Sequence, residues 1–286
     1  MTTTVRQSLL GFFGAASLVA VLAGCWTAAD AGVALAIWAR MIAAWLVGLI
    51  IAIAMGWAGS RGEQRLAGIV PLIVTVIALF LLAACFADPG LQGVHRWIVV
   101  GAIRINAAAI VLPLMIVVLG QRVWAPIAMI AVLLLLVAQP DASQASGFAV
   151  AAIILLLAGK RTRGALASVG VMAVLGIIAW YRPDPLASVA EVEGIIGLAW
   201  QRAPVMAALA VVALALATAA PILSGFRSNG AAAPALAAYL AVTAIAPAIG
   251  AFPVPLVGMS MSPIIGFWLG IGALGARSLA LRPRPQ

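Results

Sequence analysis

Charged residues are so widely spaced in this chain of 286 residues that long apolar stretches separate them. A helix needs about 17 to 25 uncharged, mostly apolar residues to cross the hydrocarbon core of a bilayer. Nine stretches meet this requirement, and the last is long enough for two helices with a turn rich in proline between them. The sequence therefore predicts about ten membrane-spanning helices, at residues 7–29, 41–60, 66–87, 105–121, 123–140, 142–159, 164–181, 203–226, 231–249 and 260–276.

Composition supports the same interpretation. Hydrophobic residues make up 66% of the chain and charged residues 8%, whereas soluble domains have about 45 to 50% apolar and about 25% charged residues. Too few polar residues are available to cover a soluble body, so a soluble globular fold is excluded. Since no internal repeat or linker interrupts the apolar stretches, we expect one all-α polytopic membrane domain over residues 1–286.

The distribution of charge predicts the orientation of this domain. Loops on the side of the N-terminus hold eleven of the 16 Lys and Arg residues, and six of the seven acidic residues lie on the other side. Basic residues in short loops stay in the cytoplasm, so both termini are predicted to be cytoplasmic. The basic residues are scattered over many loops and do not form one basic face, so no nucleic-acid partner is expected.

One feature offers a different reading of the first helix. The sequence Leu-Ala-Gly-Cys that ends at Cys25 is similar to the cleavage box of a bacterial lipoprotein, behind a short apolar segment. Cleavage there would leave an odd number of spans, so we expect Cys25 to stay within the first helix. Lipidation of Cys25 is the alternative.

Two polar clusters on the predicted outer side are candidates for function. Arg96 and Trp97 precede the fourth span, and Arg104 and Asn106 lie at its start. A guanidinium group binds phosphate through two parallel hydrogen bonds, so these arginines could hold an anionic head group. The alternative is that they are interface residues whose charged ends reach the water.

The second cluster is the tripeptide formed by Gln139, Pro140 and Asp141 between the fifth and sixth spans. A carboxylate beside apolar walls can act as a general base. The alternative is that Asp141 caps the helix that follows it. Because no span carries a charge near its centre, a proton-driven transporter is disfavoured.

These clusters resemble motifs of the SEDS family (shape, elongation, division and sporulation), which includes FtsW, RodA and SpoVE. Members have ten membrane helices, a Gly-x-x-Arg-Trp-Ile segment before helix 4 and a Gln-Pro-Asp after helix 5. Gly93, Arg96, Trp97 and Ile98 match the first motif, and residues 139–141 match the second. Residues 253–257, together with Ser262, are similar to the hydrophobic run with proline near the C-terminus of the family.

The chain also departs from the family pattern. Asn106 and the residues after it replace the Gln-Pro-x-Glu and Lys of helix 4, and the family's Leu-Gly-Thr after the aspartate reads Ala142, Ser143 and Gln144. The large outer loop between helices 7 and 8 is reduced to residues 182–202, where Glu193 is a candidate to replace a family aspartate. The chain is therefore expected to be a shortened and divergent relative.

The resemblance implies a protein of cell division or cell-shape control in the bacterial inner membrane, with lipid II as substrate and peptidoglycan glycosyltransferase activity. It implies Asp141 as catalytic base, Arg96 and Arg104 as ligands of the diphosphate, and Trp97, Asn106, Gln139, Glu193 and Ser262 as further substrate-binding residues. A class B penicillin-binding protein is the expected protein partner. No cofactor is identified, and a divalent cation stays open. Two alternatives are a catalytically impaired scaffold for the penicillin-binding protein and a flippase for the lipid-linked precursor.

Overall fold

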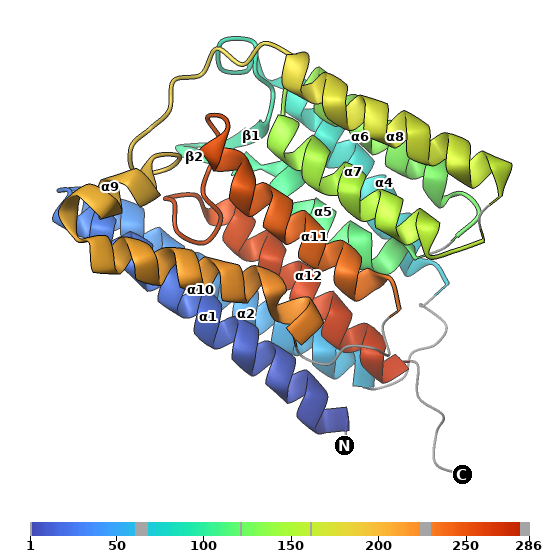
Figure 1. The fold of residues 1–286 in the computed structure, drawn as a ribbon, viewed down its shortest axis with the longest axis horizontal. Helices are drawn as coiled ribbons and strands as arrows, with labels where there is room; N and C mark the ends of the chain where they lie inside the picture. Colours follow the sequence, from blue (N-terminus) through green and yellow to red (C-terminus); the bar gives the residue numbers. More distant parts are fainter. Residues whose placement is uncertain (1, 61–67, 121, 161, 224–229, 281–286) are drawn as a thin grey trace.

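The computed structural model describes residues 2–60, 68–120, 122–160, 162–223 and 230–280. This part of the chain forms eleven α-helices, labelled as in Figure 1. They are α1 (Thr2–Asp30), α2 (Leu35–Ser60), α4 (Val70–Ala84), α5 (Ala107–Leu119), α6 (Ala125–Ala138), α7 (Ala142–Leu157), α8 (Arg163–Tyr181), α9 (Ile195–Arg202), α10 (Pro204–Leu223), α11 (Ala232–Ile245) and α12 (Met261–Ala280). Two short 3₁₀ helices, η1 (Cys85–Ala87) and η3 (Ala246–Ala248), extend α4 and α11.

Most of the helices are apolar, and some have the length of membrane spans. In the described part, five are long and apolar enough to cross a bilayer: Ser8–Asp30, Leu35–Gly59, Val70–Ala87, Arg163–Tyr181 and Pro204–Leu223. Large apolar side chains such as Ile50, Phe80 and Ile127 point outward from the bundle. Helices satisfy their own backbone hydrogen bonds, so they can present such surfaces to lipid. The chain is a multi-pass membrane protein.

Each of the ten predicted spans overlaps one of these helices. Helices α1 and α2 begin before their predicted spans, α12 ends after its span, and several others are shorter than predicted. The structure adds one helix, α9, within the predicted outer segment 182–202. It also adds a two-stranded antiparallel hairpin, β1 (Trp97–Val100) and β2 (Ile103–Asn106), to the predicted all-α fold. Ile105, predicted to begin the fourth span, lies in β2, because β-branched residues dominate this segment and favour strands.

Helix α12 lies at the centre of the bundle and packs against α2 and α5. Gly266 permits this packing, since a methyl group at its Cα would overlap the carbonyl oxygen of Ala109 on α5. On the side that faces α1 and α2, the fully buried ring of Trp268 makes edge contacts with Phe13 and Trp45, at 4.8 and 5.5 Å between ring centroids. A well-packed centre of this kind holds the loops at its ends in fixed positions.

Both cysteines are buried and free of disulfide bonds. The thiol of Cys25 donates to the carbonyl oxygen of Trp38 at 3.4 Å, and that of Cys85 donates to the carbonyl oxygen of Leu81 at 3.4 Å. Lipidation of Cys25 stays a hypothesis.

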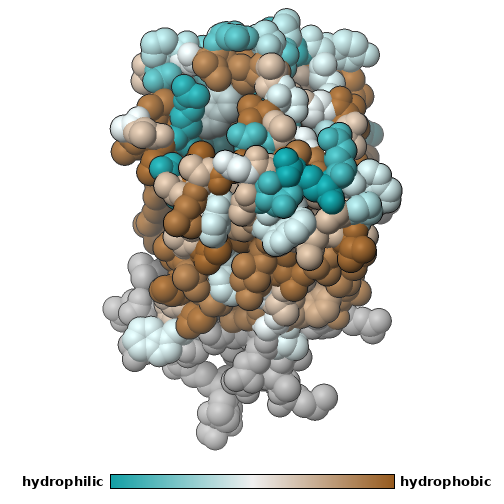
Figure 2. Space-filling view, turned by 90° about the vertical axis from the view of Figure 1, so that its left-hand side faces the viewer, coloured by the Kyte–Doolittle hydropathy of each residue, from teal (hydrophilic) through white to brown (hydrophobic). Residues whose placement is uncertain are grey.

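Helix α1 begins and α12 ends at the same end of the bundle (Figure 1). The hairpin, α9 and the segment between α11 and α12 lie at the opposite end, here called the pocket end. Figure 2 shows hydrophilic residues gathered over the upper half of one side of the molecule, with hydrophobic residues below them. The start of α1 and the end of α12 at one end of the bundle agree with an even number of spans. The assignment of that end to the cytoplasm stays a prediction.

Candidate functional site

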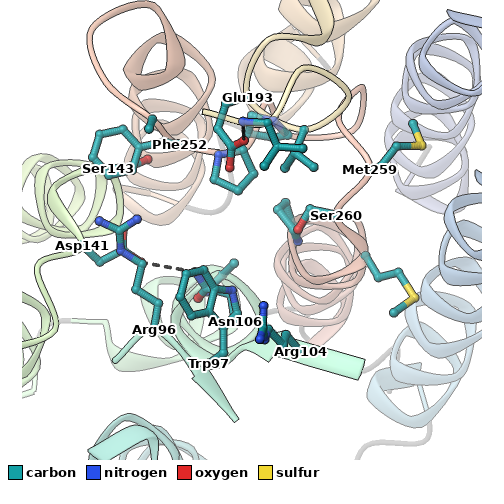
Figure 3. A pocket seen from close by; sticks show the side chains of 18 of the residues that line it. Arg96, Trp97, Arg104, Asn106, Asp141, Ser143, Glu193, Phe252, Met259 and Ser260 are labelled. Atoms are coloured by element: carbon teal, nitrogen blue, oxygen red, sulfur yellow. Dashed lines mark hydrogen bonds and ion pairs between the residues drawn. The ribbon is translucent and has the colours of Figure 1, made fainter. Parts of the chain in front are cut away.

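A cavity of about 500 Å³ opens at the pocket end (Figure 3). Its walls come from α2, the hairpin, the start of α7, the loop between α8 and α9, α11, and the segment between α11 and α12. These segments are far apart in sequence and meet only because the helices bring their ends together. A concave site with a few converging polar groups is the usual form of a ligand-binding site.

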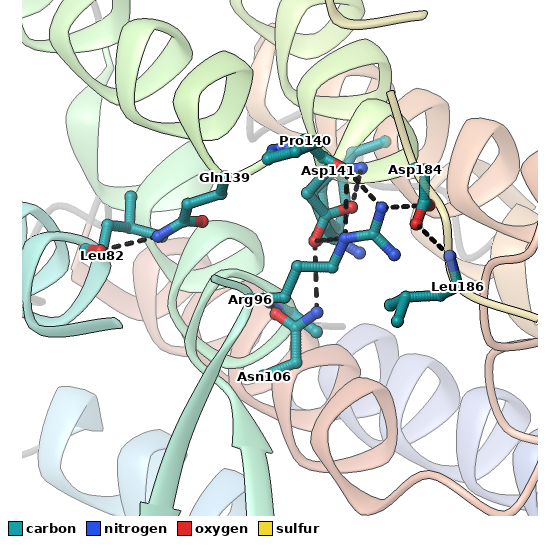
Figure 4. A network of polar contacts seen from close by, with 11 residues as sticks. Leu82, Arg96, Asn106, Gln139, Pro140, Asp141, Asp184 and Leu186 are labelled. Carbon is teal, nitrogen blue, oxygen red and sulfur yellow. Dashed lines mark hydrogen bonds and ion pairs between the residues drawn. The ribbon is translucent and has the colours of Figure 1, made fainter. Parts of the chain in front are cut away.

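Six of the eight predicted site residues line this cavity: Arg96, Trp97, Arg104, Asn106, Asp141 and Glu193. The other two, Gln139 and Ser262, do not line it. Gln139 is fully buried, and its amide nitrogen donates to the carbonyl oxygen of Leu82 at 2.6 Å, which ties the end of α6 to α4 (Figure 4). The hydroxyl of Ser262 accepts a hydrogen bond from the backbone N–H of Asn106 at 2.9 Å, which joins α12 to the end of β2.

A polar network beside the cavity consists of three buried residues, Arg96, Asn106 and Asp141, together with the partly exposed Asp184 (Figure 4). The guanidinium of Arg96, 3% exposed, donates to the carbonyl oxygen of Pro140 and pairs with the carboxylate of Asp184. It also lies 3.9 Å from Asp141 and stacks over the ring of Phe252, at 5.1 Å from the centroid. A buried charge needs such partners, so Arg96 is held in place by both carboxylates.

Asp141 is 2% exposed, and both of its carboxylate oxygens are hydrogen-bonded. Oδ1 accepts from the backbone N–H of Gln144 at 3.2 Å, and Oδ2 accepts from the amide of Asn106 at 3.2 Å. Asp141 is thus the N-cap of α7, which confirms the capping role considered from the sequence. Asn106 caps α5 in the same way through Ala109. The network therefore connects the starts of two helices.

Three charged side chains line the cavity outside this network, and we call them the rim: Arg40, Arg104 and Glu193. Arg40, on α2, and Arg104, on β2, are both exposed. Within the described part of the chain, neither side chain makes a hydrogen bond or an ion pair. The rim therefore offers two cations to a ligand. Arg40 was not among the predicted site residues, although its place next to the second span on the predicted outer side was a signal.

Glu193 is half-buried in the loop between α8 and α9. Its Oε2 accepts a hydrogen bond from the backbone N–H of Val189 at 2.8 Å. Two further backbone bonds hold this part of the loop, from Val254 to Val192 at 3.2 Å and from Met259 to Glu191 at 3.0 Å. Burial raises the pKa of Glu193 above its ordinary value, because a carboxylate loses hydration there.

A metal ion would need several ligands close together. Over the ranges that the structure describes, no group of three or more His, Cys, Asp and Glu residues could hold one.

Similarity to solved structures identifies the fold of the chain. No protein-family model and no curated protein matches the sequence. Among solved structures, the chain is similar to the rod shape determining protein RodA of Thermus thermophilus, with a TM-score of 0.66 and 17% identity over 94% of this chain and 95% of RodA. An alanine mutant of that RodA matches with a TM-score of 0.67 and 17% identity, over 94% and 96% of the two chains. The chain therefore has the fold of RodA, a SEDS protein, carried by a divergent sequence.

Proposed function

We propose that this protein is a peptidoglycan glycosyltransferase that polymerises lipid II at the outer face of the bacterial inner membrane. One observation carries the proposal: two arginines that have no side-chain partner among the described residues, and a carboxylate with a raised pKa, line the same cavity at the end of an apolar bundle. A lipid diphosphate has an apolar tail that suits the bilayer and an anionic head group that suits arginine. The RodA-like fold and the motifs around Arg96 and Asp141 support the same substrate.

The reaction assigned to the cavity is a glycosyl transfer. A sugar hydroxyl of the acceptor attacks the anomeric carbon of the donor and forms the new C–O bond. The bond between that carbon and the diphosphate oxygen breaks, and the lipid diphosphate leaves with the electron pair. The proton of the hydroxyl passes to a carboxylate, and cations stabilise the charge on the leaving diphosphate.

The two carboxylates in the cavity wall suit different roles. Asp141, the base expected from the resemblance, uses both oxygens in the network that caps α7 and holds Arg96. Glu193 lines the cavity, its Oε2 accepts a backbone hydrogen bond, and burial raises its pKa above the ordinary value, which favours proton uptake. We therefore assign the base to Glu193 and a positioning role to Asp141. Arg40 and Arg104 are the assigned ligands of the diphosphate.

A polymerisation assay tests the function directly. Purified protein in lipid nanodiscs is incubated with fluorescent lipid II, and the products are separated by size. The expected result is a ladder of glycan strands that a muramidase degrades. Lipid II that stays unpolymerised, both alone and with a class B penicillin-binding protein added, would overturn the proposal.

The buried network favours a second candidate, a catalytically impaired scaffold for a class B penicillin-binding protein. Arg96 and Asp141, which the SEDS motifs place at the substrate, are occupied by contacts within the protein. A scaffold would copurify with the penicillin-binding protein and yet make no glycan strands. Strand synthesis by the purified chain alone would exclude this candidate.

A further inference from the structure

Two buried, uncharged polar side chains line the cavity, and we call them its floor. Gln144, at the start of α7, and Tyr239, on α11, both line it. The hydroxyl of Tyr239 donates to Oε1 of Gln144. Tyr239 is fully buried, and it packs so close to α7 that a methyl group on Gly147 would lie 3.0 Å from Cδ2 of its ring. The two side chains therefore form a fixed pair between the helices.

This pair orients the amide of Gln144. Its carbonyl oxygen is used by Tyr239, so its NH₂ group is left as a donor. In the part of the chain that the structure describes, this NH₂ group has no hydrogen-bond partner, and Gln144 is 8% exposed. Because Gln144 lines the cavity, an acceptor on a bound ligand can reach this oriented donor and form a hydrogen bond with it.

Charge decides which acceptor fits. The carboxylate of Asp141 accepts from the backbone N–H of Gln144 at 3.2 Å, and the network around it sets one cation, Arg96, against two carboxylates, so the charge beside Gln144 is net negative. A phosphate oxygen placed there would be repelled, whereas Arg40 and Arg104 attract it to the rim. An uncharged oxygen, such as the carbonyl of an acetamido group or a hydroxyl, meets no such repulsion. The cavity thus separates an anion site at the rim from a neutral acceptor site at the floor.

We infer that Gln144, held by Tyr239, is a specificity-determining residue that recognises an uncharged oxygen on the sugar of the substrate. The inference rests on the proposed function, because it assumes a sugar linked to the diphosphate, and it adds a residue outside the predicted site. Gln144 stands where the SEDS pattern has threonine, so this donor is a feature of this chain.

A binding experiment tests the inference with three lipids: undecaprenyl diphosphate, its N-acetylglucosamine derivative and its glucose derivative. Affinities are measured for protein in nanodiscs. We expect the wild type to bind one or both sugar lipids about tenfold more tightly than the bare diphosphate, as one good hydrogen bond allows. A gain for the N-acetylglucosamine lipid alone identifies the acetamido carbonyl as the acceptor, and an equal gain for glucose identifies a hydroxyl.

Two variants carry the test. Gln144→Met keeps the length of the side chain and removes the donor, so the gain should disappear while the affinity for bare diphosphate stays. Tyr239→Phe keeps the packing and releases the amide, so the gain should fall to about threefold. Thr243→Val is the matched control, since the Thr243 hydroxyl already bonds the backbone oxygens of Tyr239 and Leu240 at 3.0 Å.

The outcomes distinguish failure of the inference on Gln144 from failure of the proposed function. A gain that survives in Gln144→Met, or no gain in the wild type, would overturn the inference while diphosphate binding still supports the proposed function. Failure of the wild type to bind any of the three lipids would overturn both.

Discussion

The rim and the buried network contain the same kinds of side chain in opposite situations. In the network, Arg96 and Asp141 are 3% and 2% exposed and have partners within the protein. At the rim, Arg40 and Arg104 are exposed and have no partner among the described residues. A charge with its partners already in place contributes mainly to structure, whereas an unpaired charge at a cavity is available to a ligand. The comparison therefore assigns positioning to the network and substrate chemistry to the rim.

The strongest test of this division is removal of the rim carboxylate. Glu193→Gln should lower the polymerisation rate about 100-fold or more, because the variant cannot accept the proton of the attacking hydroxyl. Glu191→Gln is the matched control, since Glu191 lies in the same loop but does not line the cavity. Initial rates of strand formation give the comparison. Equal rates for Glu193→Gln and wild type would remove Glu193 from the chemistry.

Removal of the network carboxylate should instead affect folding. Asp141→Ala loses the cap of α7 and one partner of Arg96, and we expect a loss of about 3 kcal/mol in the free energy of unfolding. Asp141→Asn keeps an oxygen for the Gln144 N–H, so it should remain folded and polymerise within about tenfold of the wild-type rate. Denaturant unfolding and the polymerisation assay measure the two effects. A folded Asp141→Asn protein with a 100-fold lower rate would make Asp141 the base, as the resemblance predicted.

Features that depend on residues close together in the sequence could be predicted. Spans were predictable because the length of an uncharged stretch is a local property that the bilayer thickness dictates. The cap formed by Asp141 was a foreseeable alternative, since capping depends on residues three positions apart.

The pairing of Arg96 with Asp184 was not predictable, because 88 residues separate them and they meet only in the folded bundle, where Arg96 precedes the hairpin and Asp184 follows α8. The same holds for Arg40, which enters the site only through the packing of α2 near the hairpin. The hairpin was not predicted: most of it was assigned to the outer segment before the fourth span, and only Ile105 and Asn106 were assigned to the span itself, since a short apolar run fits either a helix or a strand.

Neutralising the rim cations should weaken ligand binding without affecting the fold. Arg40→Gln and Arg104→Gln should each lower the affinity for undecaprenyl diphosphate about tenfold, since each removes a charge-assisted hydrogen bond. Arg202→Gln is the control: Arg202 is also exposed, but it pairs with Asp30 at 2.7 Å and does not line the cavity. Binding isotherms at low and moderate salt provide the measurement. If the control weakens binding as much as the rim variants, the attraction is a general effect of net charge.

The smallest expected effect is the pH dependence that Glu193 contributes. Because burial raises its pKa, the folded protein binds the proton more tightly than the unfolded chain. Stability from this group is therefore greatest below the ordinary pKa and falls as pH rises to the raised value. The polymerisation rate should change in the opposite direction over the same range, because the base must lose its proton.

Thermal unfolding and initial rates, measured between about pH 4 and about pH 7, show both trends. Glu193→Gln should remove the stability trend, and Asp141→Asn should keep it. A stability trend that persists in Glu193→Gln would belong to another group, and the assignment of the base to the rim would lose its support from pH. Solvent reaches Glu193, so the change in stability is expected to be small, and the opposite signs of the two trends, more than their size, distinguish a catalytic carboxylate from a structural one.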